Sequence, residues 1–359
     1  MRKFLIVLVV LAGVALVRPL IGQARRTLDI YSIDVEGGGA TLFVSPSGES
    51  LLVDTGNPGA RDAERIAAAV KLAGLTQIDY VVISHYHGDH VGGVPDLATR
   101  VPMRTFVDHG SEVHDGSQFK LKDDIFQSYL RHRARGRHLA VKPGDTIPIQ
   151  GLAVTVVSSD GAALQKPLPG GGAPNPLCAD FAAQDVDLSE NARSVGVVVS
   201  LGRFRMLNLG DLTWNKERDL VCPNNLLGNI DVYLTTHHGL NLSGPPVLVH
   251  AIRPRVALMN NGPRKGASKE AWMTVRHSPG LEDLWQLHYA MRRPGNPAFR
   301  ENGESGGTEF NVPETHIANV AEVAEHSPAY VLQVSAREDG SFTVTNHRNG
   351  FSRTYAARR

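Results

Sequence analysis

A short segment of this chain places three histidines and one aspartate directly after an apolar run. The segment is Ser84-His85-Tyr86-His87-Gly88-Asp89-His90-Val91-Gly92-Gly93, and residues 80–83 are the apolar run. Neutral imidazoles and a carboxylate suit zinc and other borderline divalent ions. In extended backbone His85 and His87 point to the same side. A turn at Gly88 can bring Asp89 and His90 to a second position. The spacing favours a metal site over the alternative, a histidine-rich surface loop.

Three further apolar segments are each followed by residues that could bind a metal ion. The segments are residues 50–53, 203–209 and 229–234, and the residues beyond them are Asp54, Asp211 and the pair His237 and His238. Strands bury their apolar lengths while their ends open into a shared crevice, where reactive groups collect. We therefore expect these residues to join the histidine segment in one metal site. Taken singly, Asp211 could be a turn aspartate and His237 a capping or surface histidine.

The elements that position these residues alternate between strands and helices. Strands are expected at residues 28–35, 40–44, 50–53, 80–83, 103–107, 152–157, 195–201, 203–209 and 229–234. The first three strands form a β-meander, and apolar residues at helical spacing predict a helix over residues 60–73. This order implies a layered α/β arrangement.

Two more helices and a hairpin complete the expected elements. The charged residues 123–138 and the residues 281–291 are interpreted as helices. The second helix would place Trp285, His288 and Tyr289 in core or surface positions rather than in the site. Glu338-Asp339-Gly340 is a turn signal, which predicts a hairpin of residues 330–336 and 341–345.

The first 24 residues differ in composition from the rest of the 359-residue chain. Arg2 and Lys3 precede the apolar residues 4–17, and Gly22-Gln23-Ala24 is a small-residue ending. This layout predicts a secretory signal peptide over residues 1–24 and therefore a periplasmic or secreted protein. An uncleaved N-terminal anchor is the alternative, and only in that case is a membrane expected as a partner.

Charge and cysteine content limit the other expectations. The whole chain has net charge +1, and without residues 1–24 it keeps 34 basic and 36 acidic side chains. No strong nucleic-acid binding is expected from this balance. The basic residues 131–138 are interpreted as a solvated face, with contact to an anionic substrate as the alternative. The only cysteines, Cys178 and Cys222, could pair in an exported chain, and the sequence leaves their pairing open.

Taken together, these motifs resemble the metallo-β-lactamase superfamily. Within it, the pattern is similar to the hydrolase domain of ComEC-type DNA-uptake proteins. The resemblance covers residues 28–295 and is carried by Asp34-Val35-Glu36-Gly37-Gly38-Gly39-Ala40-Thr41, Leu52-Val53-Asp54-Thr55-Gly56, the segment 85–93, Asn191-x-x-Ser194, Leu209-Gly210-Asp211 and His237-His238-Gly239. It implies a hydrolase domain over residues 25–295, followed by an extension, residues 296–359, whose hairpin packs on the sandwich.

The resemblance implies an α/β fold, the four-layer αβ/βα metallo-β-lactamase sandwich, with two metal ions at one edge. By position, His85 and His87 would bind the first ion, Asp89 and His90 the second, and Asp211 would bridge them. His238 would complete the second position while His237 contacts the substrate or the attacking water, although the two histidines could exchange roles. Asp54 would hold the metal loop in place by contacting a ligand residue rather than the ion itself. Two Zn²⁺ ions are expected, with Mn²⁺ or Fe²⁺ as alternatives.

One departure from the superfamily concerns the first ion. The family often supplies a further histidine after the strand that corresponds to residues 152–157, and this chain has Ser158-Ser159-Asp160-Gly161 there. Asp160 is one candidate replacement, and His109, at the end of its own strand, is the other. Without either, the first position would lack a ligand.

The predicted function is that of an exported metal-dependent hydrolase in which a metal-activated water attacks the substrate. Asp89 would orient this water, and His237 is the second candidate catalytic residue. The ComEC-type resemblance favours phosphodiesters or phosphate esters among small-molecule and ester substrates, with lactones or β-lactams as the alternative. An inactive metal-binding envelope protein is the alternative of another class. The sequence leaves the oligomeric state open.

Overall fold

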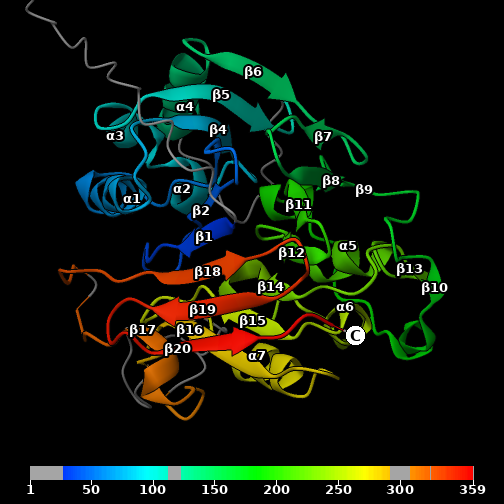
Figure 1. Cartoon of the computed structure of the whole chain (residues 1–359). Coiled ribbons are helices and arrows are strands. Elements are labelled where there is room, and N and C mark those ends of the chain that lie inside the picture. The colour runs from blue at the N-terminus through cyan, green and yellow to red at the C-terminus, as the bar shows by residue number, and fades with distance from the viewer. Residues whose placement is uncertain (1–26, 112–122, 292–307, 324, 359) are drawn as a thin grey trace, which may run out of the picture.

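Two large mixed β-sheets form the centre of the molecule (Figure 1), and the computed structural model describes residues 27–111, 123–291, 308–323 and 325–358. The predicted signal peptide lies outside the described residues. The first sheet has the order β20-β19-β18-β1-β2-β3-β4-β5-β6. Its strands are β1 Leu28–Ser32, β2 Thr41–Val44, β3 Ser50–Val53, β4 Ile78–Val82, β5 Met103–Asp108, β6 Arg137–Ala140, β18 Leu332–Ala336, β19 Phe342–Asn346 and β20 Ser352–Tyr355.

The second sheet has the order β17-β16-β15-β14-β12-β11-β8-β7, with β9 paired to β8. Its strands are β7 Thr146–Ile147, β8 Ala153–Ser159, β9 Ala162–Ala163, β11 Gly196–Leu201, β12 Phe204–Asn208, β14 Val232–Leu234, β15 Val256–Met259, β16 Asp283–His288 and β17 Ile317–Asn319. A separate small sheet pairs β10 Ala173–Pro174 with β13 Asn224–Asn225.

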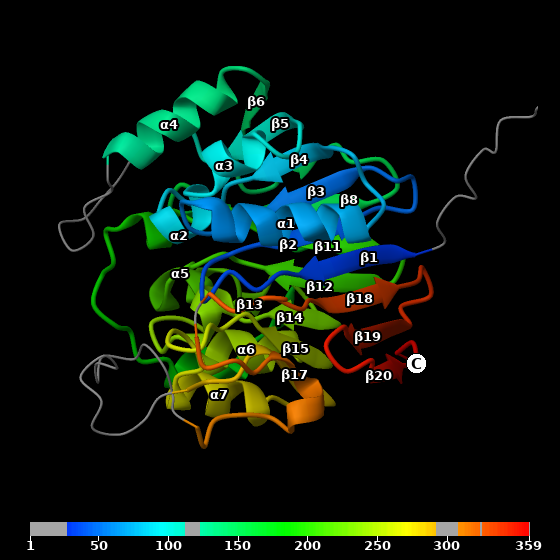
Figure 2. The ribbon, with the colours of Figure 1, turned by 90° about the vertical axis from the view of Figure 1, so that its left-hand side faces the viewer.

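Helices cover the outer face of each sheet (Figure 2). The helices of the first sheet are α1 Ala60–Leu72, α2 Gly88–Val91, α3 Val94–Ala98 and α4 Asp123–Arg133. The helices of the second sheet are α5 Trp214–Asp219, α6 Pro246–Ile252 and α7 Lys269–Arg276. Short 3-10 turns are η1 Pro176–Asp180, η2 Glu190–Arg193, η3 Thr236–Gly239 and η4 Glu314–His316.

The apolar core is divided into three clusters that correspond to three interfaces between layers. In β3, Leu51 and Val53 belong to the cluster between the sheets, whereas Leu52 belongs to the cluster under α1. In β11, Val198 likewise points to the helix side of the second sheet. Neighbouring strand residues face opposite sides of a sheet, so strands that are apolar throughout can fill two interfaces at once. The predicted four-layer αβ/βα sandwich is confirmed.

The C-terminal strands extend the first sheet. In β18 and β19, Ala336 pairs with Phe342, which confirms the predicted hairpin, and Leu28 of β1 pairs with Ala336. The hairpin is therefore hydrogen-bonded to the edge of the first sheet, beside β1 (Figure 1), rather than packed on a face of the sandwich. Without β18, the edge of β1 would expose unpaired backbone groups.

The helix predicted for residues 281–291 is wrong. Asp283–His288 is strand β16, which lies between the parallel strands β15 and β17. Leu284, Trp285 and Leu287 are all buried, on both faces of the strand. A strand buried on both faces has an apolar pattern that resembles a short buried helix, and periodicity does not separate the two. The helix expected over residues 123–138 ends at Arg133, and strand β6 follows it.

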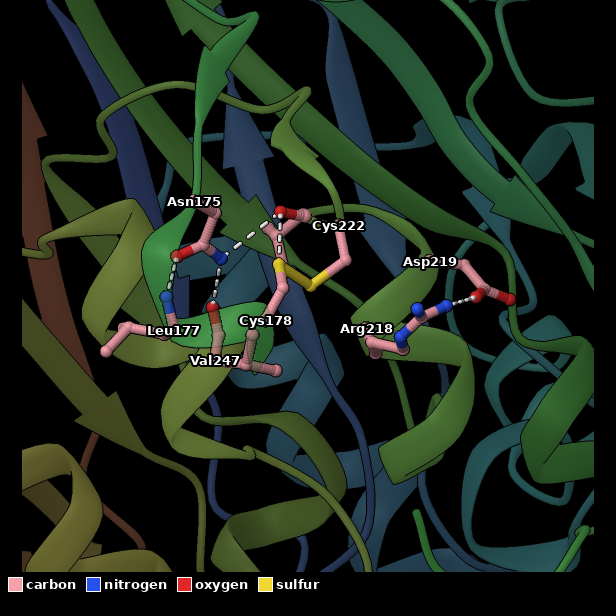
Figure 3. The surroundings of a disulfide bond; sticks show 8 residues. Asn175, Leu177, Cys178, Arg218, Asp219, Cys222 and Val247 are labelled. Atoms are coloured by element: carbon pink, nitrogen blue, oxygen red, sulfur yellow. Dashed lines mark hydrogen bonds and ion pairs between the residues drawn. A yellow bond between two sulfur atoms is a disulfide. The ribbon is translucent and has the colours of Figure 1, made fainter. Parts of the chain in front are cut away.

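Cys178 and Cys222 form a disulfide (Figure 3), with Cα atoms 5.8 Å apart. Cys178 lies in η1, where the Asn175 side chain accepts a hydrogen bond from the Leu177 backbone N–H. The Asn175 side-chain amide also donates to the backbone carbonyls of Val221 and Val247. These contacts hold the long connection between β9 and β11 against the end of α5 and the start of α6.

None of the helices in the described part of the chain is long and apolar enough to cross a membrane.

Candidate metal centre

The four predicted strand ends meet at one edge of the sandwich. β3 and β4 are parallel in the first sheet, as are β12 and β14 in the second, so the residues that follow them emerge together. Asp89, His90, Asp211 and His238 offer one ligand atom each, and these atoms all lie within 4.8 Å of one another. The structure thus assembles two carboxylates and two imidazoles from both sheets, in the donor chemistry that zinc, manganese and iron accept.

His90 is held by a carboxylate on the side away from this group. Its Nδ1–H donates to Asp54 Oδ2 at 2.8 Å, while its Nε2 lies 3.2 Å from Asp211 Oδ2. Asp54 also accepts hydrogen bonds from the backbone N–H and the hydroxyl of Ser84. A carboxylate on Nδ1 fixes the tautomer and leaves Nε2 for an ion. Asp54 therefore contacts His90 and Ser84 at the start of the metal loop, and its supporting role stays a prediction.

His237 and His238 both turn toward Asp211. Their Nε2 atoms lie 3.4 Å and 3.2 Å from its Oδ2. Both have left-handed backbone, with φ of 55° and 57°. His238 Nε2 also lies 3.7 Å from Asp89 Oδ2, and its Nδ1 contacts the Asn260 side chain. His238 is thus a member of the four-residue group, and His237 stands at its border with Nδ1 near the Ser243 hydroxyl.

His85 and His87 lie next to this group as a pair. His85 Nε2 and His87 Nδ1 face each other at 3.0 Å, and His85 Nδ1 lies 3.0 Å from the Ser84 hydroxyl. The predicted first position therefore has two converging ring nitrogens.

Neither predicted replacement for the missing histidine joins the group. Asp160 is exposed and pairs with Arg193, because the turn after β8 directs it away from the strand ends. His109 Nε2 lies 3.0 Å from Glu190 Oε2, and its ring packs on Tyr86. At the strand end itself, buried Ser158 and Ser159 donate to the backbone carbonyls of Ser194 and Val141. The second position is therefore better supplied with ligands than the first.

Electrostatics around His90 fit a bound cation. Burial disfavours a charged His90, yet the carboxylates of Asp211, Asp89 and Asp54 together raise its pKa well above the ordinary value. Burial would raise the pKa of Asp211, but the neighbouring imidazoles, His238 first, hold that pKa well below its usual range. A protonated His90 and the ammonium of Lys265 therefore balance the negative charges of Asp89 and Asp211. A divalent ion bound here would balance the same charges.

Burial keeps the rings of His85, His237 and His238 neutral, because it lowers the pKa of each. Burial lowers the pKa of His85 well below the ordinary value and lowers the pKa of His237 to about 3. A metal ligand must be unprotonated, so this state favours binding. In the described residues, His90 Nε2 and Asp211 Oδ1 are buried and make no hydrogen bond. Such buried atoms are costly unless something else binds them, and a metal ion here would do so.

Two glycines allow the first loop to lie directly against this group. A Cβ on Gly38 would be 2.4 Å from the Asp89 carbonyl oxygen, and one on Gly39 would be 2.7 Å from Asp54 Oδ2. The Gly39 N–H donates to the same Asp89 carbonyl. Only glycine leaves enough space for this approach, which fixes the backbone of the metal loop.

Sequence reasoning missed Lys265 and Asn260. Lys265 Nζ lies 2.5 Å from Asp89 Oδ2, and Asn260 contacts His238. Both belong to the loop after β15, a strand that we did not predict. The same strand-end argument that found Asp54 and Asp211 would have pointed to this loop.

The basic residues 131–138 do not contribute to the group. Arg133 and His138 each lie 2.8 Å from a carboxylate oxygen of buried Asp108, and Arg131 and Arg135 are exposed. The exposed residues fit the interpretation as a solvated face, whereas Arg133 and His138 form ion pairs that the sequence did not predict.

We expect Asp54→Asn to weaken metal binding roughly 10- to 100-fold, because His90 loses its carboxylate partner. Asp54 has φ of 64°, and asparagine tolerates this left-handed backbone as aspartate does, so the charge is the main change. Competition with a coloured chelator would measure the affinity, with Asp79→Asn as a control on strand β4. Unchanged affinity would show that Asp54 only shapes the loop.

The family comparison agrees with this architecture. Residues 34–172 match the family model described as "Metallo-beta-lactamase superfamily". With the four layers and the strand-end site described above, the chain has the metallo-β-lactamase fold.

Among similar proteins, an "Atrochrysone carboxyl ACP thioesterase dmxR1" from Cryptosporiopsis sp. (strain 8999) is 26% identical over 34% of this chain and 32% of its own length. A "Hydroxyacylglutathione hydrolase" from Acidiphilium cryptum (strain JF-5) is 29% identical over 37% of this chain and 41% of its own length. The metallo-beta-lactamase fold protein YhfI from Bacillus subtilis covers 73% of this chain and 96% of its own, at 14% identity and a TM-score of 0.41. The chain therefore spans less than half the length of the two relatives matched by sequence.

Proposed function

We propose that this protein is a metal-dependent hydrolase in which a metal-activated water attacks an ester substrate. The convergence of Asp89, His90, Asp211 and His238 within 4.8 Å carries this proposal. These four residues would hold one ion, and His85 and His87 would hold a second with help from Asp211. Zn²⁺ is the first candidate, with Mn²⁺ or Fe²⁺ as alternatives. The bound metal would lower the pKa of its water toward neutrality and polarise the bond under attack.

The protein's own residues have separate tasks in this mechanism. Asp89 Oδ2 faces His90 and His238 and would orient the attacking water by accepting its hydrogen bond. His237 is neutral and stands at the border of the group, where it would contact the substrate or the water. Asp54 and Asn260 hold the imidazoles of His90 and His238 in place.

Lys265 favours a substrate with negative charge beside the scissile bond. Its ammonium lies against Asp89, and once an ion neutralised that carboxylate, Lys265 could bind a substrate anion. Phosphodiesters and phosphate esters have such a charge, and the ComEC-type resemblance points to the same class. Acyl thioesters are the second candidate, because relatives are named as thioesterase and hydroxyacylglutathione hydrolase. Lactones and β-lactams are the third candidate class of substrate.

The substrate class can be ranked with a panel of bis-p-nitrophenyl phosphate, a hydroxyacyl thioester, a lactone and a β-lactam. We expect turnover that is lost after chelation and restored by Zn²⁺, with the phosphodiester preferred. Turnover of the thioester alone would replace the phosphodiester proposal with the second candidate. A metal-loaded protein that turns over no ester of any class would favour the inactive metal-binding envelope protein.

Lys265→Met should lower kcat/KM for the anionic substrate roughly 10- to 100-fold, since a hydrogen bond to a charged group contributes about 1.5–3 kcal/mol. Methionine retains the apolar stem, and the metal content should not fall, because a positive charge beside the ion is removed. Lys269→Met, at an exposed position of α7, is the matched control. An equal loss on a neutral lactone would indicate a general effect on the site instead.

We propose further that the protein is exported to the periplasm or the medium. The composition of residues 1–24 supports export, and so does the Cys178–Cys222 disulfide, because disulfides persist in oxidising compartments. N-terminal sequencing of protein from the periplasm or medium should begin at Arg25. Protein found only in the cytoplasm with an intact N-terminus would contradict export.

A further inference from the structure

A second group of ligand-type side chains lies at the same edge of the sandwich, outside the candidate metal centre. Asp34 and Glu36 follow β1, His288 ends β16, and His326 lies in the connection between β17 and β18. One ligand atom from each lies within 4.8 Å of the others. These four residues come from both sheets and from a segment more than 280 residues away from β1 in sequence.

The contacts of His326 show how closely the group is packed. Its Nε2 lies 3.3 Å from Asp34 Oδ2, and its Nδ1 lies 3.1 Å from Glu36 Oε1. The His326 and His288 rings are 5.2 Å apart between centroids. The Asp34 side chain is fully buried, and those of Glu36 and His326 are 5% and 8% exposed.

His288 supplies the observation that points to a ligand. It is fully buried, and its Nδ1 lies 2.9 Å from the Tyr289 carbonyl oxygen. A carbonyl only accepts, so Nδ1 donates its proton to it, and Nε2 is the ring nitrogen that faces the carboxylates. That Nε2 is buried and has no hydrogen-bond partner among the described residues. A buried ring nitrogen without a partner is costly, and a cation held between this nitrogen and the two carboxylates would bind all three groups.

The ion pairs of the group explain only part of this arrangement. Arg65 Nη1 lies 2.9 Å from Glu36 Oε1 and 3.8 Å from Asp34 Oδ2. With a protonated His326, this guanidinium balances both carboxylate charges. This charge balance does not explain why two buried atoms have no hydrogen bond in the described structure. These atoms are His288 Nε2 and Glu36 Oε2. Glu36 also has φ of 60°, an uncommon backbone conformation for a residue other than glycine.

We propose that Asp34, Glu36, His288 and His326 form an additional binding site for a divalent cation of the zinc class. Two imidazoles and two carboxylates are a donor set for Zn²⁺. A cavity of about 950 Å³ borders the group at Glu36, Arg65 and His326. The ion would be structural, because it would join the loop after β1 to β16 and to the connection before β18.

If this site binds zinc, its ion should be lost in a variant of one of its ligands while the ions of the candidate metal centre remain. After dialysis against micromolar Zn²⁺, His288→Gln should retain one zinc ion per chain fewer than wild type, and Zn²⁺ should raise its melting temperature less. His250→Gln is the matched control, since His250 bonds the Thr274 carbonyl away from both groups. If His288→Gln does not fold, Glu36→Gln replaces it. An unchanged zinc content in the folded variant would overturn the proposal.

Wild-type protein offers a second measurement that does not depend on variants. Anomalous diffraction at the zinc edge, from crystals equilibrated with Zn²⁺, should show a peak between these four side chains. If no peak appears there, the four residues form an ion-pair network without metal, and the proposal is overturned. Failure at this site would not affect the proposed hydrolase, whose ions would be held by Asp89, His90, Asp211 and His238 and by the pair His85 and His87.

Discussion

Asp211→Asn is expected to lower kcat/KM by on the order of 10³-fold or more, with loss of bound metal. Asp211 Oδ2 lies 3.2 Å from the Nε2 atoms of both His90 and His238, and 3.4 Å from that of His237. Asparagine retains the shape but removes the charge that attracts a divalent ion and balances the imidazoles. The variant should therefore keep its side chain in place but lack the negative charge that binds the ion.

The measurement combines steady-state kinetics on the preferred ester with metal content by mass spectrometry. Asp160→Asn is the matched control, because the exposed Asp160 pairs with Arg193 and should leave both quantities unchanged. Circular dichroism would verify that the Asp211 variant is folded. Full turnover in a folded Asp211→Asn would exclude Asp211 from the metal site and with it the proposed mechanism.

Removal of the disulfide by Cys178→Ala with Cys222→Ala is expected to lower the free energy of unfolding by about 3–4 kcal/mol. The two cysteines are 44 residues apart, and closing a loop of this length restricts the unfolded chain. The closed loop contains the part of the β9–β11 connection that follows Cys178, and Asn175, just before the loop, bonds Val221 and Val247. Urea denaturation at neutral pH, monitored by fluorescence, would measure the change.

Reduction provides the internal control for this prediction. Dithiothreitol should destabilise the wild type to the level of the double variant and should leave the double variant unchanged. Equal stability of wild type and variant under oxidising conditions would show that the crosslink adds nothing beyond the contacts of Asn175. The same comparison on protein purified from the periplasm would show whether the bond forms there.

Much of the candidate site could be predicted because its ligands directly follow strands. Asp54, Asp211 and His238 come shortly after apolar segments whose type is evident from composition, and parallel strands bring their ends together. The length and polarity of each segment are local properties. The β-meander and the C-terminal hairpin followed from the same local patterns, whereas the four-layer sandwich was implied by the resemblance to the metallo-β-lactamase superfamily.

The errors arose where local patterns are ambiguous. β16 is buried on both faces, so its apolar residues resembled a helix, and His288 was placed with core and surface residues. Asp160 has the right chemistry and position in sequence, but the turn after β8 directs it to Arg193. The direction of a side chain in a turn depends on tertiary contacts that spacing does not contain.

The sequence by itself determined the kind of chemistry that this protein presents: imidazoles and carboxylates at strand ends in a layered α/β chain. Only the tertiary structure decided which of these residues meet. It brought Lys265 to Asp89 and excluded Asp160 and His109 from the group. It also joined His326 to Asp34 and paired Cys178 with Cys222. The physical reason is that whether a segment forms a strand depends largely on its own and neighbouring residues. Contacts between distant segments depend instead on strand order and sheet packing.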